Sequence, residues 1–532
     1  MKRFGVMLDM SRNGVMKVDE VINFARIIKS FGYNIIELYT EDTYEIENEP
    51  YFGYMRSRYS VEEQKRIVDE CEKLGIEVIP CIQTLAHLNQ IFRWKPYHEI
   101  NDCNDILLCE EEKTYQLIEH MISSLRKTFK SHYIHIGMDE AEMIGLGKYL
   151  KKNGYQNRFE ILSKHLKRVI EICNKYDFKP MMWSDMYFKL MNNGEYYSNG
   201  VNEEAKKLTP KNVSLVYWDY YHTDKETYDK MIEGHQKFDN EIIFAGGSWT
   251  WSGFAPNNHY TLKTMLPAME SCKEHNIENI FITMWGDDGK ECSFYSVLPC
   301  LYTIRRYYEG ERDLNKIKQD FNTLTHENYD DLMNLDALNF PLEDEEHVYN
   351  PSKYFLYNDI FNGYFDSLVN GNETQQYHKI TKELEEASKR SSSYAYIFNY
   401  LGSLSHVLEL KVDLGLRLRK AYKLKDFKTL KNLSLEIEEI VRRIKVFYHN
   451  FSYLWYKENK ASGFDIQDVR LGGLILRLEA CKKRLDAYIE GKVDSIEELE
   501  QEILEYKGEG ISNSQVRPYC NNYQKIVSVN VF

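Results

Sequence analysis

Eight short β-rich runs, separated by stretches with helical periodicity, constrain the fold of this chain more than any other feature. Most of the gaps between the runs hold an amphipathic pattern, as in Val18–Phe31 and Ser60–Leu74. Strands that alternate with helices predict parallel pairing with helical crossovers, and eight such units predict a TIM (β/α)8 barrel. The runs are Phe4–Leu8, Tyr33–Tyr39, Ile76–Ile82, Tyr133–Ile136, Pro180–Trp183, Val213–Trp218, Ile242–Ala245 and Ile280–Trp285.

Beyond about Tyr308 the strand signals stop and long helical patterns take over. Apolar residues recur at helical spacing, as in Leu433, Ile437, Ile440 and Ile444, which predicts core-facing stripes of a helical bundle. The sequence therefore predicts two domains, an α/β barrel over 1–310 and an all-α domain over 311–532. The predicted helices are Gln375–Arg390, Tyr394–Lys423, Asp426–Tyr448, Val469–Glu490 and Ser495–Tyr506, and Ile526–Phe532 alternates as a strand would.

The charge balance and the apolar patterning exclude two classes of partner. The chain has 68 Lys and Arg against 82 Asp and Glu, a net charge of -14. Because phosphate contacts need a basic surface, no nucleic-acid partner is expected. No apolar run approaches the roughly 18 residues of a membrane span, and the N-terminus reaches Asp9 too soon for a secretory signal. We therefore expect a cytoplasmic protein without a membrane partner.

The ten cysteines are scattered along the chain, and none forms a C-x-x-C pair. In a chain of this length, such spacing indicates free thiols in a reducing compartment rather than a disulfide framework or a zinc site. We expect no metal and no cofactor.

In a TIM barrel the functional residues follow the strands at one face, so the residues directly after each run are the candidates. Two adjacent carboxylates, Asp139 and Glu140, come just after the fourth run and the glycine that ends it. Such a pair beyond a strand predicts acid chemistry on a loop. The other candidates are Asp9, Arg12, Asp42, His87, Trp183, Asp185, Trp218, Asp219, Tyr221, Trp249, Trp251, Trp285, Asp287 and Asp288.

Five of the seven tryptophans follow strands and are therefore expected on this one face. Indole rings pack against the C–H faces of a sugar, while charged planar groups bind its hydroxyls. An aromatic, partly desolvated pocket and the neighbouring Asp139 would raise the pKa of Glu140, as a proton donor to a glycosidic oxygen requires. We therefore predict a glycosidase with Glu140 as its acid.

Adjacent carboxylates do not fit the usual geometry of glycosidases. A retaining enzyme places two carboxylates about 5–5.5 Å apart on opposite sides of the anomeric carbon, and an inverting enzyme places them about 6.5–9.5 Å apart. Neighbours on one loop more plausibly reach the substrate from one side. In an alternative mechanism the substrate supplies the nucleophile, with Glu140 as acid and Asp139 holding the nucleophilic group.

At these residues the chain resembles glycoside hydrolase family 20, the β-N-acetylhexosaminidases. The segment His-Ile-Gly-Met-Asp-Glu at 135–140 matches the family's signature His-x-Gly-[Gly/Met]-Asp-Glu. Three further segments are similar to family motifs and occur in the family's order, namely Leu8–Arg12, Gln83–His87 and Trp285–Asp287. The resemblance covers about Met1 to Tyr308 and implies the same barrel fold.

The resemblance also implies a retaining, substrate-assisted release of a terminal β-linked N-acetylhexosamine. Asp139 would orient the 2-acetamido group of the substrate, and Glu140 would protonate the leaving oxygen. Arg12 would hold the 3- and 4-hydroxyls of the terminal sugar with its planar fork. Of the remaining candidates, Trp183, Trp218 and Trp285 would line the acetamido pocket, Tyr221, Trp251 and Asp287 would also bind substrate, His87 and Asp42 would support Glu140, and His135 would be an inward, hydrogen-bonded supporting residue.

Some segments depart from the family's pattern. In the family a tyrosine after the seventh strand usually binds the acetamido oxygen, but Gly246–Trp251 contains no tyrosine. We predict that Tyr221 takes this role. Asp287 replaces the usual Glu near the 4- and 6-hydroxyls, and its shorter arm affects which epimer fits. The second strand's segment lacks the family's histidines, which leaves the role of Asp42 open. Since the first strand begins at about Phe4, we expect a compact subtype without the usual preceding α/β domain.

Other interpretations stay open. The chain could be another retaining barrel glycosidase, or a non-catalytic barrel that binds sugars, although binding alone needs no proton donor. A metal cage of Asp185, Asp219 and Asp288 fits less well, since no His-x-His follows the first strand. The expected partner is a small oligosaccharide or glycoside with a terminal N-acetylhexosamine, and the sequence is compatible with a homo-oligomer.

Overall fold

The computed structural model describes residues 3–198, 200–201, 203–340, 348–508 and 518–531. The chain forms two compact units. The barrel unit consists of the described residues within Met1–Ser248, Thr261–Trp285 and Cys300–Ile317. The helical unit consists of the described residues within Trp249–Tyr260, Gly286–Pro299 and Lys318–Phe532.

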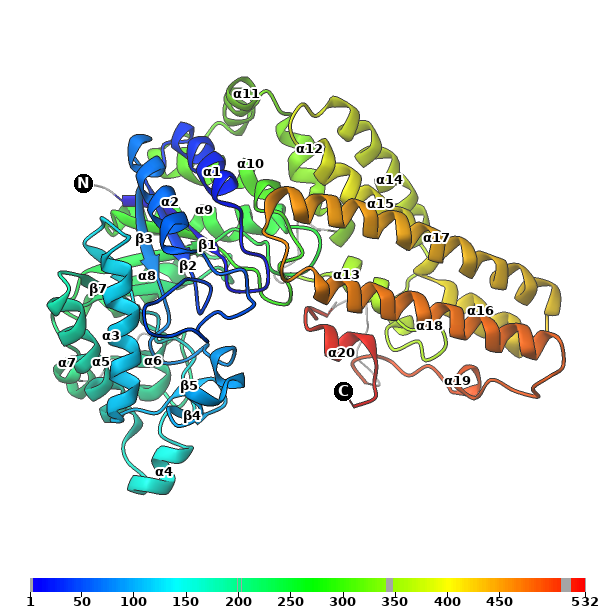
Figure 1. The fold of residues 1–532 in the computed structure, drawn as a ribbon. Helices are drawn as coiled ribbons and strands as arrows, with labels where there is room; N and C mark the ends of the chain where they lie inside the picture. The colour runs from blue at the N-terminus through cyan, green and yellow to red at the C-terminus, as the bar shows by residue number, and fades with distance from the viewer. Residues whose placement is uncertain (1–2, 199, 202, 341–347, 509–517, 532) are drawn as a thin grey trace. The chain divides into compact units, whose positions relative to one another are not determined.

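The barrel unit, drawn mostly in blue to green in Figure 1, contains eight parallel strands. They close into a barrel in the order β1-β10-β9-β8-β7-β6-β3-β2. Each of the eight predicted runs overlaps one of these strands, and the predicted TIM barrel is confirmed. The strands are β1 Arg3–Asp9, β2 Ile35–Tyr39, β3 Glu77–Cys81, β6 Tyr133–His135, β7 Lys179–Trp183, β8 Ser214–Trp218, β9 Ile242–Gly247 and β10 Asn279–Met284. A separate two-stranded sheet pairs β4 Asn101–Cys103 with β5 Ile106–Leu107.

Alternate residues of the strands meet in the barrel's interior, because successive side chains of a strand point to opposite faces. The strand register places Tyr39 beside Cys81, Cys81 beside His135, and His135 beside Met181. Tyr39, Cys81, Met181 and Trp183 belong to one buried cluster that fills the barrel. This layer lies near the carboxyl ends of the strands, so it supports the loops that follow them.

Helices surround the barrel between successive strands, as the apolar periodicity predicts. α2 illustrates how local chemistry defines a boundary: the Ser60 side chain accepts from the Glu63 N–H, and the Glu63 carboxylate accepts from the Ser60 N–H, a capping box. The helices between β1 and the end of the barrel unit are α1 Val18–Ser30, α2 Val61–Lys73, α3 Glu112–Arg126, α4 Lys148–Asn153, α5 Arg158–Lys175, α6 Asp185–Met191, α7 Glu203–Leu208, α8 Lys225–Gln236, α9 Asn258–Glu274, α10 Leu298–Glu309 and α11 Leu314–Thr325.

The helical unit is built from long helices, and the predicted all-α region is confirmed. The stripe Leu433, Ile437, Ile440 and Ile444 is buried, as its spacing predicts. The helices that follow α11 are α12 Tyr329–Met333, α13 Pro351–Tyr357, α14 Glu373–Arg390, α15 Ala395–Lys411, α16 Leu414–Lys423, α17 Phe427–Glu458, α18 Asp465–Ile489, α19 Glu497–Glu500 and α20 Tyr523–Val527.

Two helical predictions and one alternating pattern differ in detail from the structure. The helix predicted over Tyr394–Lys423 is two helices, α15 and α16, with Val412 and Asp413 between them. The segment Ser495–Tyr506 is helical only over the short α19. The alternating segment Ile526–Phe532 begins in a helix, since Ile526 and Val527 are the last two residues of α20, and Phe532 lies outside the described residues.

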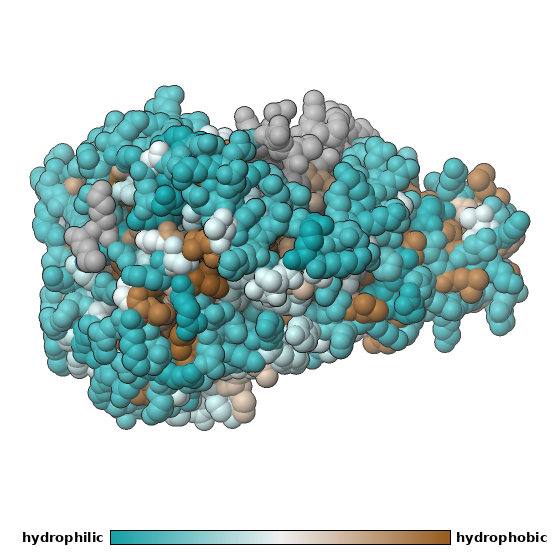
Figure 2. All heavy atoms as spheres, turned by 90° about the horizontal axis from the view of Figure 1, so that it is seen from above, coloured by the Kyte–Doolittle hydropathy of each residue, from teal (hydrophilic) through white to brown (hydrophobic). Residues whose placement is uncertain are grey.

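Surface features agree with the charged composition. On the face drawn in Figure 2, hydrophilic residues cover most of the surface and hydrophobic residues form separate small patches. None of the helices in the described part of the chain combines the length and apolar character that crossing a membrane requires. All ten cysteines are free thiols, and eight of them are buried.

Candidate active site

The loop after β6 carries the two adjacent carboxylates in a constrained backbone. Gly137, Met138 and Glu140 have φ of 72°, 75° and 52°, in the left-handed region. A Cβ at Gly137 would collide with the side-chain amide of Gln83, so only glycine fits there. Non-glycine residues in this region cost free energy and persist only where surrounding contacts hold them.

Side chains from neighbouring barrel strands hold the loop after β6 in this conformation. Gln83, two residues beyond β3, donates from Nε2 to Asp139 Oδ1 at 2.7 Å and accepts from the Met138 N–H at 3.2 Å. Asp185, at the start of α6, accepts from the Glu140 N–H with Oδ2 at 3.0 Å. The loop is therefore held on both sides, and the two carboxylates take different positions: the Asp139 side chain is 12% exposed and that of Glu140 is 51% exposed.

His87 bridges the two carboxylates. Its Nε2 lies 3.4 Å from Asp139 Oδ2 and 3.6 Å from Glu140 Oε2. Burial disfavours the charged imidazolium, but the negative charge and hydrogen bond of Asp139 outweigh it and raise the pKa of His87 to about 10. On its other side, Asp105 accepts from the His87 backbone N–H at 3.0 Å, and its Oδ2 lies 3.9 Å from His87 Nδ1.

The surroundings shift the pKa values of the two carboxylates in opposite directions. Burial favours protonation of Asp139, but His87 and the hydrogen bond from Gln83 outweigh it and lower the pKa of Asp139. For Glu140, burial and then the negative charge of Asp139 raise the pKa. Paired carboxylates with separated pKa values can divide acid and base roles, so Asp139 suits an ionised acceptor and Glu140 a proton donor.

Asp185 adds a third carboxyl group to this cluster. Its side chain is fully buried, and Lys189 Nζ lies 3.4 Å from Oδ2. Burial, followed by the charge of Asp139, raises the pKa of Asp185 to about 7. Within the described residues, Oδ1 of Asp185 has no hydrogen-bond partner.

Arg12 is joined to the loop after β6 by a chain of buried polar groups. Its Nη2 lies 3.0 Å from Glu41 Oε1, and its Nε lies 4.0 Å from Asp9 Oδ2. Tyr39 donates its hydroxyl to Glu41 at 3.2 Å and accepts from Gln83 Nε2 at 2.9 Å. Since the same Gln83 nitrogen binds Asp139, the guanidinium of Arg12 and the carboxylate of Asp139 are held in one network.

Three of the predicted tryptophans lie together at the barrel's interior. Trp183 and Trp285 have ring centroids 5.9 Å apart, and Trp285 packs edge-on against Tyr39 at 4.9 Å. Trp218 and Trp285 are partly buried and pack against the barrel cluster that includes Trp183. Nε1 of Trp183 is buried and has no hydrogen-bond partner among the described residues. These rings form an aromatic wall in the unit that holds Asp139 and Glu140.

Tyr221 lies at the exposed edge of this wall. Its side chain is 43% exposed, and its ring centroid is 6.5 Å from that of Trp218. Its backbone N–H donates to Asp219 Oδ1 at 3.1 Å. Tyr196 packs on the same indole, with centroids 4.7 Å apart, and was not anticipated from the sequence. The role of Tyr221 as the acetamido-binding tyrosine stays a prediction.

Two predicted substrate-binding residues belong to the helical unit. Trp251 follows β9 by four residues and stacks on Trp249, with centroids 4.2 Å apart. Asp287 follows β10 by three residues and has a left-handed φ of 32°. Asn521 donates to the carboxylate of Asp287 at 3.2 Å. The sequence did not predict that these two loops group with the helical unit. The domain boundary at residue 310 stays a prediction.

The supporting residues have different partners from those expected. Asp42 accepts from Arg56 Nε at 2.9 Å, and the carboxylate beside His87 Nδ1 is Asp105. The predicted support of Glu140 by Asp42 therefore has no direct contact behind it in the described residues, because Arg56 occupies that side chain. His135 is fully buried and inward, as expected: the Gly137 N–H donates to its Nδ1 at 3.1 Å, and burial lowers its pKa to about 3.

Sequence reasoning missed the roles of Gln83, Glu41 and Asp105. Gln83 opens one quoted motif, and Glu41 directly precedes Asp42 after the second strand, so position after a strand could have identified both. Asp105 lies 18 residues beyond His87, and no local pattern marks it. In the described ranges no group of three or more His, Cys, Asp or Glu side chains is arranged to hold a metal ion.

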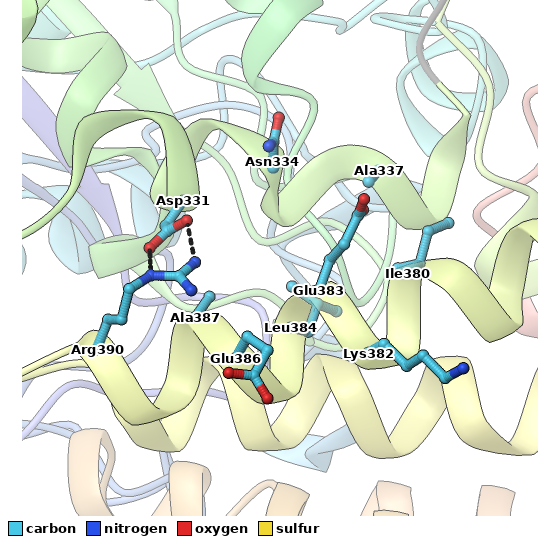
Figure 3. Close-up of a pocket in the computed structure, with 10 residues that line it drawn as sticks. All are labelled: Asp331, Asn334, Ala337, Ile380, Lys382, Glu383, Leu384, Glu386, Ala387 and Arg390. Carbon is cyan, nitrogen blue, oxygen red and sulfur yellow. Dashed lines mark hydrogen bonds and ion pairs between the residues drawn. The ribbon is translucent and has the colours of Figure 1, made fainter.

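A hollow on the helical unit is lined by residues other than the site residues described above. Arg390 donates from Nε and Nη2 to the two oxygens of Asp331, at 3.0 and 2.7 Å (Figure 3). None of the predicted site residues lines it. Its lining consists of Asp331, Asn334, Ala337, Ile380, Lys382, Glu383, Leu384, Glu386, Ala387 and Arg390.

Comparison with known proteins identifies two matching family models. Residues 5–241 match the glycosyl hydrolase family 20 catalytic domain, and residues 327–517 match the glycoside hydrolase 20C C-terminal domain. The first match contains the loop with Asp139 and Glu140, and the second lies within the helical unit.

Individual relatives are distant. Hexosaminidase D of Bos taurus is 24% identical over 245 residues, which cover 43% of this chain and 64% of that protein. Hexosaminidase D of Homo sapiens is 22% identical over 225 residues, covering 41% of this chain and 44% of that protein. The chain thus spans less than two thirds of the length of either relative. The structure of β-N-acetylhexosaminidase from Bacteroides fragilis NCTC 9343 is similar with a TM-score of 0.47 and 18% identity, over 60% of this chain and 69% of that one.

Proposed function

Because this chain belongs to glycoside hydrolase family 20, we propose that it is an exo-β-N-acetylhexosaminidase that releases terminal β-linked N-acetylglucosamine or N-acetylgalactosamine with retention. One observation supports this proposal above the others. Asp139 is buried and bound by Gln83 and His87, while its neighbour Glu140 is half exposed with a raised pKa. The pair is therefore divided into a fixed acceptor and a proton donor.

In the proposed first step, Glu140 gives its proton to the glycosidic oxygen as the bond to the anomeric carbon breaks. The carbonyl oxygen of the substrate's own 2-acetamido group attacks that carbon, and the aglycone leaves as an alcohol. The resulting oxazolinium ion carries its positive charge beside Asp139. An ionised, buried carboxylate stabilises such a charge more strongly than an exposed one, because little water screens it.

In the second step, water attacks the anomeric carbon from the face that the aglycone left, and Glu140 accepts a proton from the water. The bond from the anomeric carbon to the acetamido oxygen breaks, which restores the 2-acetamido group. Two displacements restore the original configuration. His87 contacts both carboxylates, so it can hold Glu140 in place during both proton transfers. Its pKa of about 10 keeps it positively charged at neutral pH, and it then donates to the carboxylates rather than accepting from them.

The same proposal gives the remaining residues binding roles. Arg12, held by the buried Glu41, would bind the 3- and 4-hydroxyls with a planar fork that Lys cannot reproduce. Trp183, Trp218 and Trp285 would enclose the acetamido methyl group, which is apolar. Substrate binding by Tyr221, Trp251 and Asp287 is part of the proposal, with Asp287 near the 4- and 6-hydroxyls.

A panel of aryl glycosides tests the proposed function. The purified protein should cleave aryl β-N-acetylglucosaminide or β-N-acetylgalactosaminide and should leave the plain β-glucoside essentially intact, since a 2-hydroxyl cannot act as the acetamido nucleophile. Cleavage of the glucoside at a comparable rate would point to another retaining barrel glycosidase. Binding of N-acetylglucosamine without turnover of any glycoside would indicate a sugar-binding barrel instead.

A further inference from the structure

The C-terminal residues Tyr519–Tyr523, here named the tail segment, contact the two loops that follow β9 and β10. The strand-seven loop is Trp249–Tyr260 and the strand-eight loop is Gly286–Pro299, and all three segments belong to the helical unit. Asn521 donates from Nδ2 to the Trp251 carbonyl oxygen at 3.4 Å and to Asp287 Oδ2 at 3.2 Å. One side chain of the tail segment thus joins both loops at the residues predicted to bind sugar.

Further contacts fix the ends of the tail segment. At one end, the Tyr519 ring lies edge-on to Trp249, with centroids 6.2 Å apart, and its hydroxyl accepts from Asn521 Nδ2 at 3.0 Å. At the other end, the Tyr523 N–H donates to Asp288 Oδ2 at 2.8 Å. The two ends hold Asn521 between the strand-seven loop and the strand-eight loop.

The helical unit clamps the centre of the tail segment through Asn350, the N-cap residue of α13. Its Oδ1 accepts from the Cys520 N–H at 3.0 Å, and its Nδ2 donates to the Cys520 carbonyl oxygen at 3.0 Å. The same Nδ2 donates to the Ser252 carbonyl oxygen at 2.6 Å, in the strand-seven loop. Asn521 therefore follows a residue whose backbone is fixed on both its donor and its acceptor.

Within the strand-eight loop, two buried cations contact the carboxylates of Asp288 and Glu291, and the tail segment also contacts Asp288. Lys353 Nζ lies 3.1 Å from Asp288 Oδ2 and 2.8 Å from Glu291 Oε2. Arg470 lies 2.8 Å from Asp288 Oδ1 and 2.9 Å from Glu291 Oε1. These pairs anchor the loop and neutralise those two acids.

Asp287 accepts a hydrogen bond from the side-chain amide of Asn521 at 3.2 Å. An amide donor orients a carboxylate without cancelling its charge, and a carboxylate has about four acceptor sites, so the contact is compatible with binding sugar hydroxyls. Orientation matters here because Asp287 stands where relatives are expected to carry the longer Glu. A short side chain reaches a hydroxyl over a narrower range of positions.

We propose that Asn521 is a specificity-determining positioning residue, which sets the direction of the Asp287 carboxylate and so the preference between sugars that differ at the 4-hydroxyl. This inference rests on the proposed function. Asn521 contacts Asp287 although the two residues are 234 positions apart in the sequence.

The test compares Asn521→Ala and Asn521→Asp with Gln524→Ala, an exposed residue in the adjoining α20. Asn521→Ala should raise KM for the preferred aryl N-acetylhexosaminide about tenfold with kcat within about twofold, as expected for a lost binding contact. The ratio of kcat/KM between the gluco and galacto substrates should change as well. Asn521→Asp keeps the shape but places a second carboxylate beside Asp287, so its KM should rise further.

Each outcome decides the inference. If the isosteric Asn521→Asp variant keeps the KM and the epimer ratio of Gln524→Ala, then Asn521 does not position Asp287. A fall in kcat alone, with KM and the ratio unchanged, also contradicts the assignment. Should Asn521→Ala fail to fold, Asn521→Asp and a Tyr519→Phe variant, which removes the hydroxyl next to Asn521, give the same comparison. Failure of the unmodified protein to cleave either acetamido substrate would count against the proposed function instead.

Discussion

The loops after β6 and β10 carry the acids with proposed roles, and they are held in different ways. Both contain left-handed residues, with Glu140 at φ 52° and Asp287 at φ 32°. The β6 loop is held by Gln83 and Asp185, which come from adjoining strands of the same barrel unit. The strand-eight loop is held by residues of the helical unit that lie 65 or more positions away, such as Lys353.

This difference shows that the two loops have separate supports. The contacts that hold the β6 loop come from neighbouring strand ends of the barrel unit. The contacts that hold the strand-eight loop come from the helical unit. Substitutions in the two regions should therefore affect different kinetic and thermodynamic quantities.

Glu140→Gln is expected to have the largest effect. A general acid contributes about 10²–10⁴-fold, so kcat should fall by that factor on a substrate with a poor leaving group. An activated nitrophenyl glycoside needs little proton donation and should lose much less. Steady-state kinetics on both substrates measure the difference, and equal losses would remove Glu140 from the acid role.

Arg470→Met should break the support of the strand-eight loop. It leaves Glu291, which is 1% exposed, with one cation in place of two, and disrupting a buried ion pair costs about 3–5 kcal/mol. The midpoint of denaturant unfolding should fall, whereas Lys389→Met, in an exposed pair with Glu386, should leave it unchanged. An unaltered midpoint for Arg470→Met would show that this network does not stabilise the helical unit.

Asp139→Asn should lower the rate on acetamido substrates about 10²-fold, because the oxazolinium charge loses its ionised neighbour. The substitution also removes a negative charge that raises the pKa of Glu140. Since Glu140 must be protonated to act, activity should then be lost at a lower pH as the pH rises. A pH profile of kcat/KM measures this shift; an unchanged rate and profile would exclude Asp139 from the mechanism.

Asp185→Ala should have a smaller effect than either catalytic substitution. It removes the acceptor of the Glu140 N–H, and a hydrogen bond to a charged group contributes about 1.5 kcal/mol, so kcat should fall about tenfold. Asp185→Asn keeps an oxygen acceptor and serves as the matched control, with a milder loss. If the two variants have equal activity, the acceptor at this position does not position Glu140.

The barrel could be predicted because its signal is local. Each strand run and each amphipathic helix is visible within about ten to fifteen residues, and the closed order of eight strands follows from alternation. The family motif then identified Asp139 and Glu140. The helix ends were less accurate, as at the break between α15 and α16.

The partners of the site residues could not be predicted in the same way. Asp42 and Asp105 are both acids near strand ends. Only the folded structure shows that Asp42 accepts from Arg56 and that Asp105 accepts from His87. Gln83 acts on Asp139 across 56 positions, and Asn521 on Asp287 across 234. No periodicity records such distant pairs.

The sequence by itself determined the alternation of strands and helices and the place of Asp139 and Glu140 after a barrel strand. Both can be predicted because periodicity and a short motif involve only neighbouring residues. The tertiary structure decided which of the two carboxylates has a lowered pKa and which a raised pKa, and which loops the helical region supports. The physical reason is that burial, charge and hydrogen bonding depend on distances in space. Residues far apart in the chain set those distances.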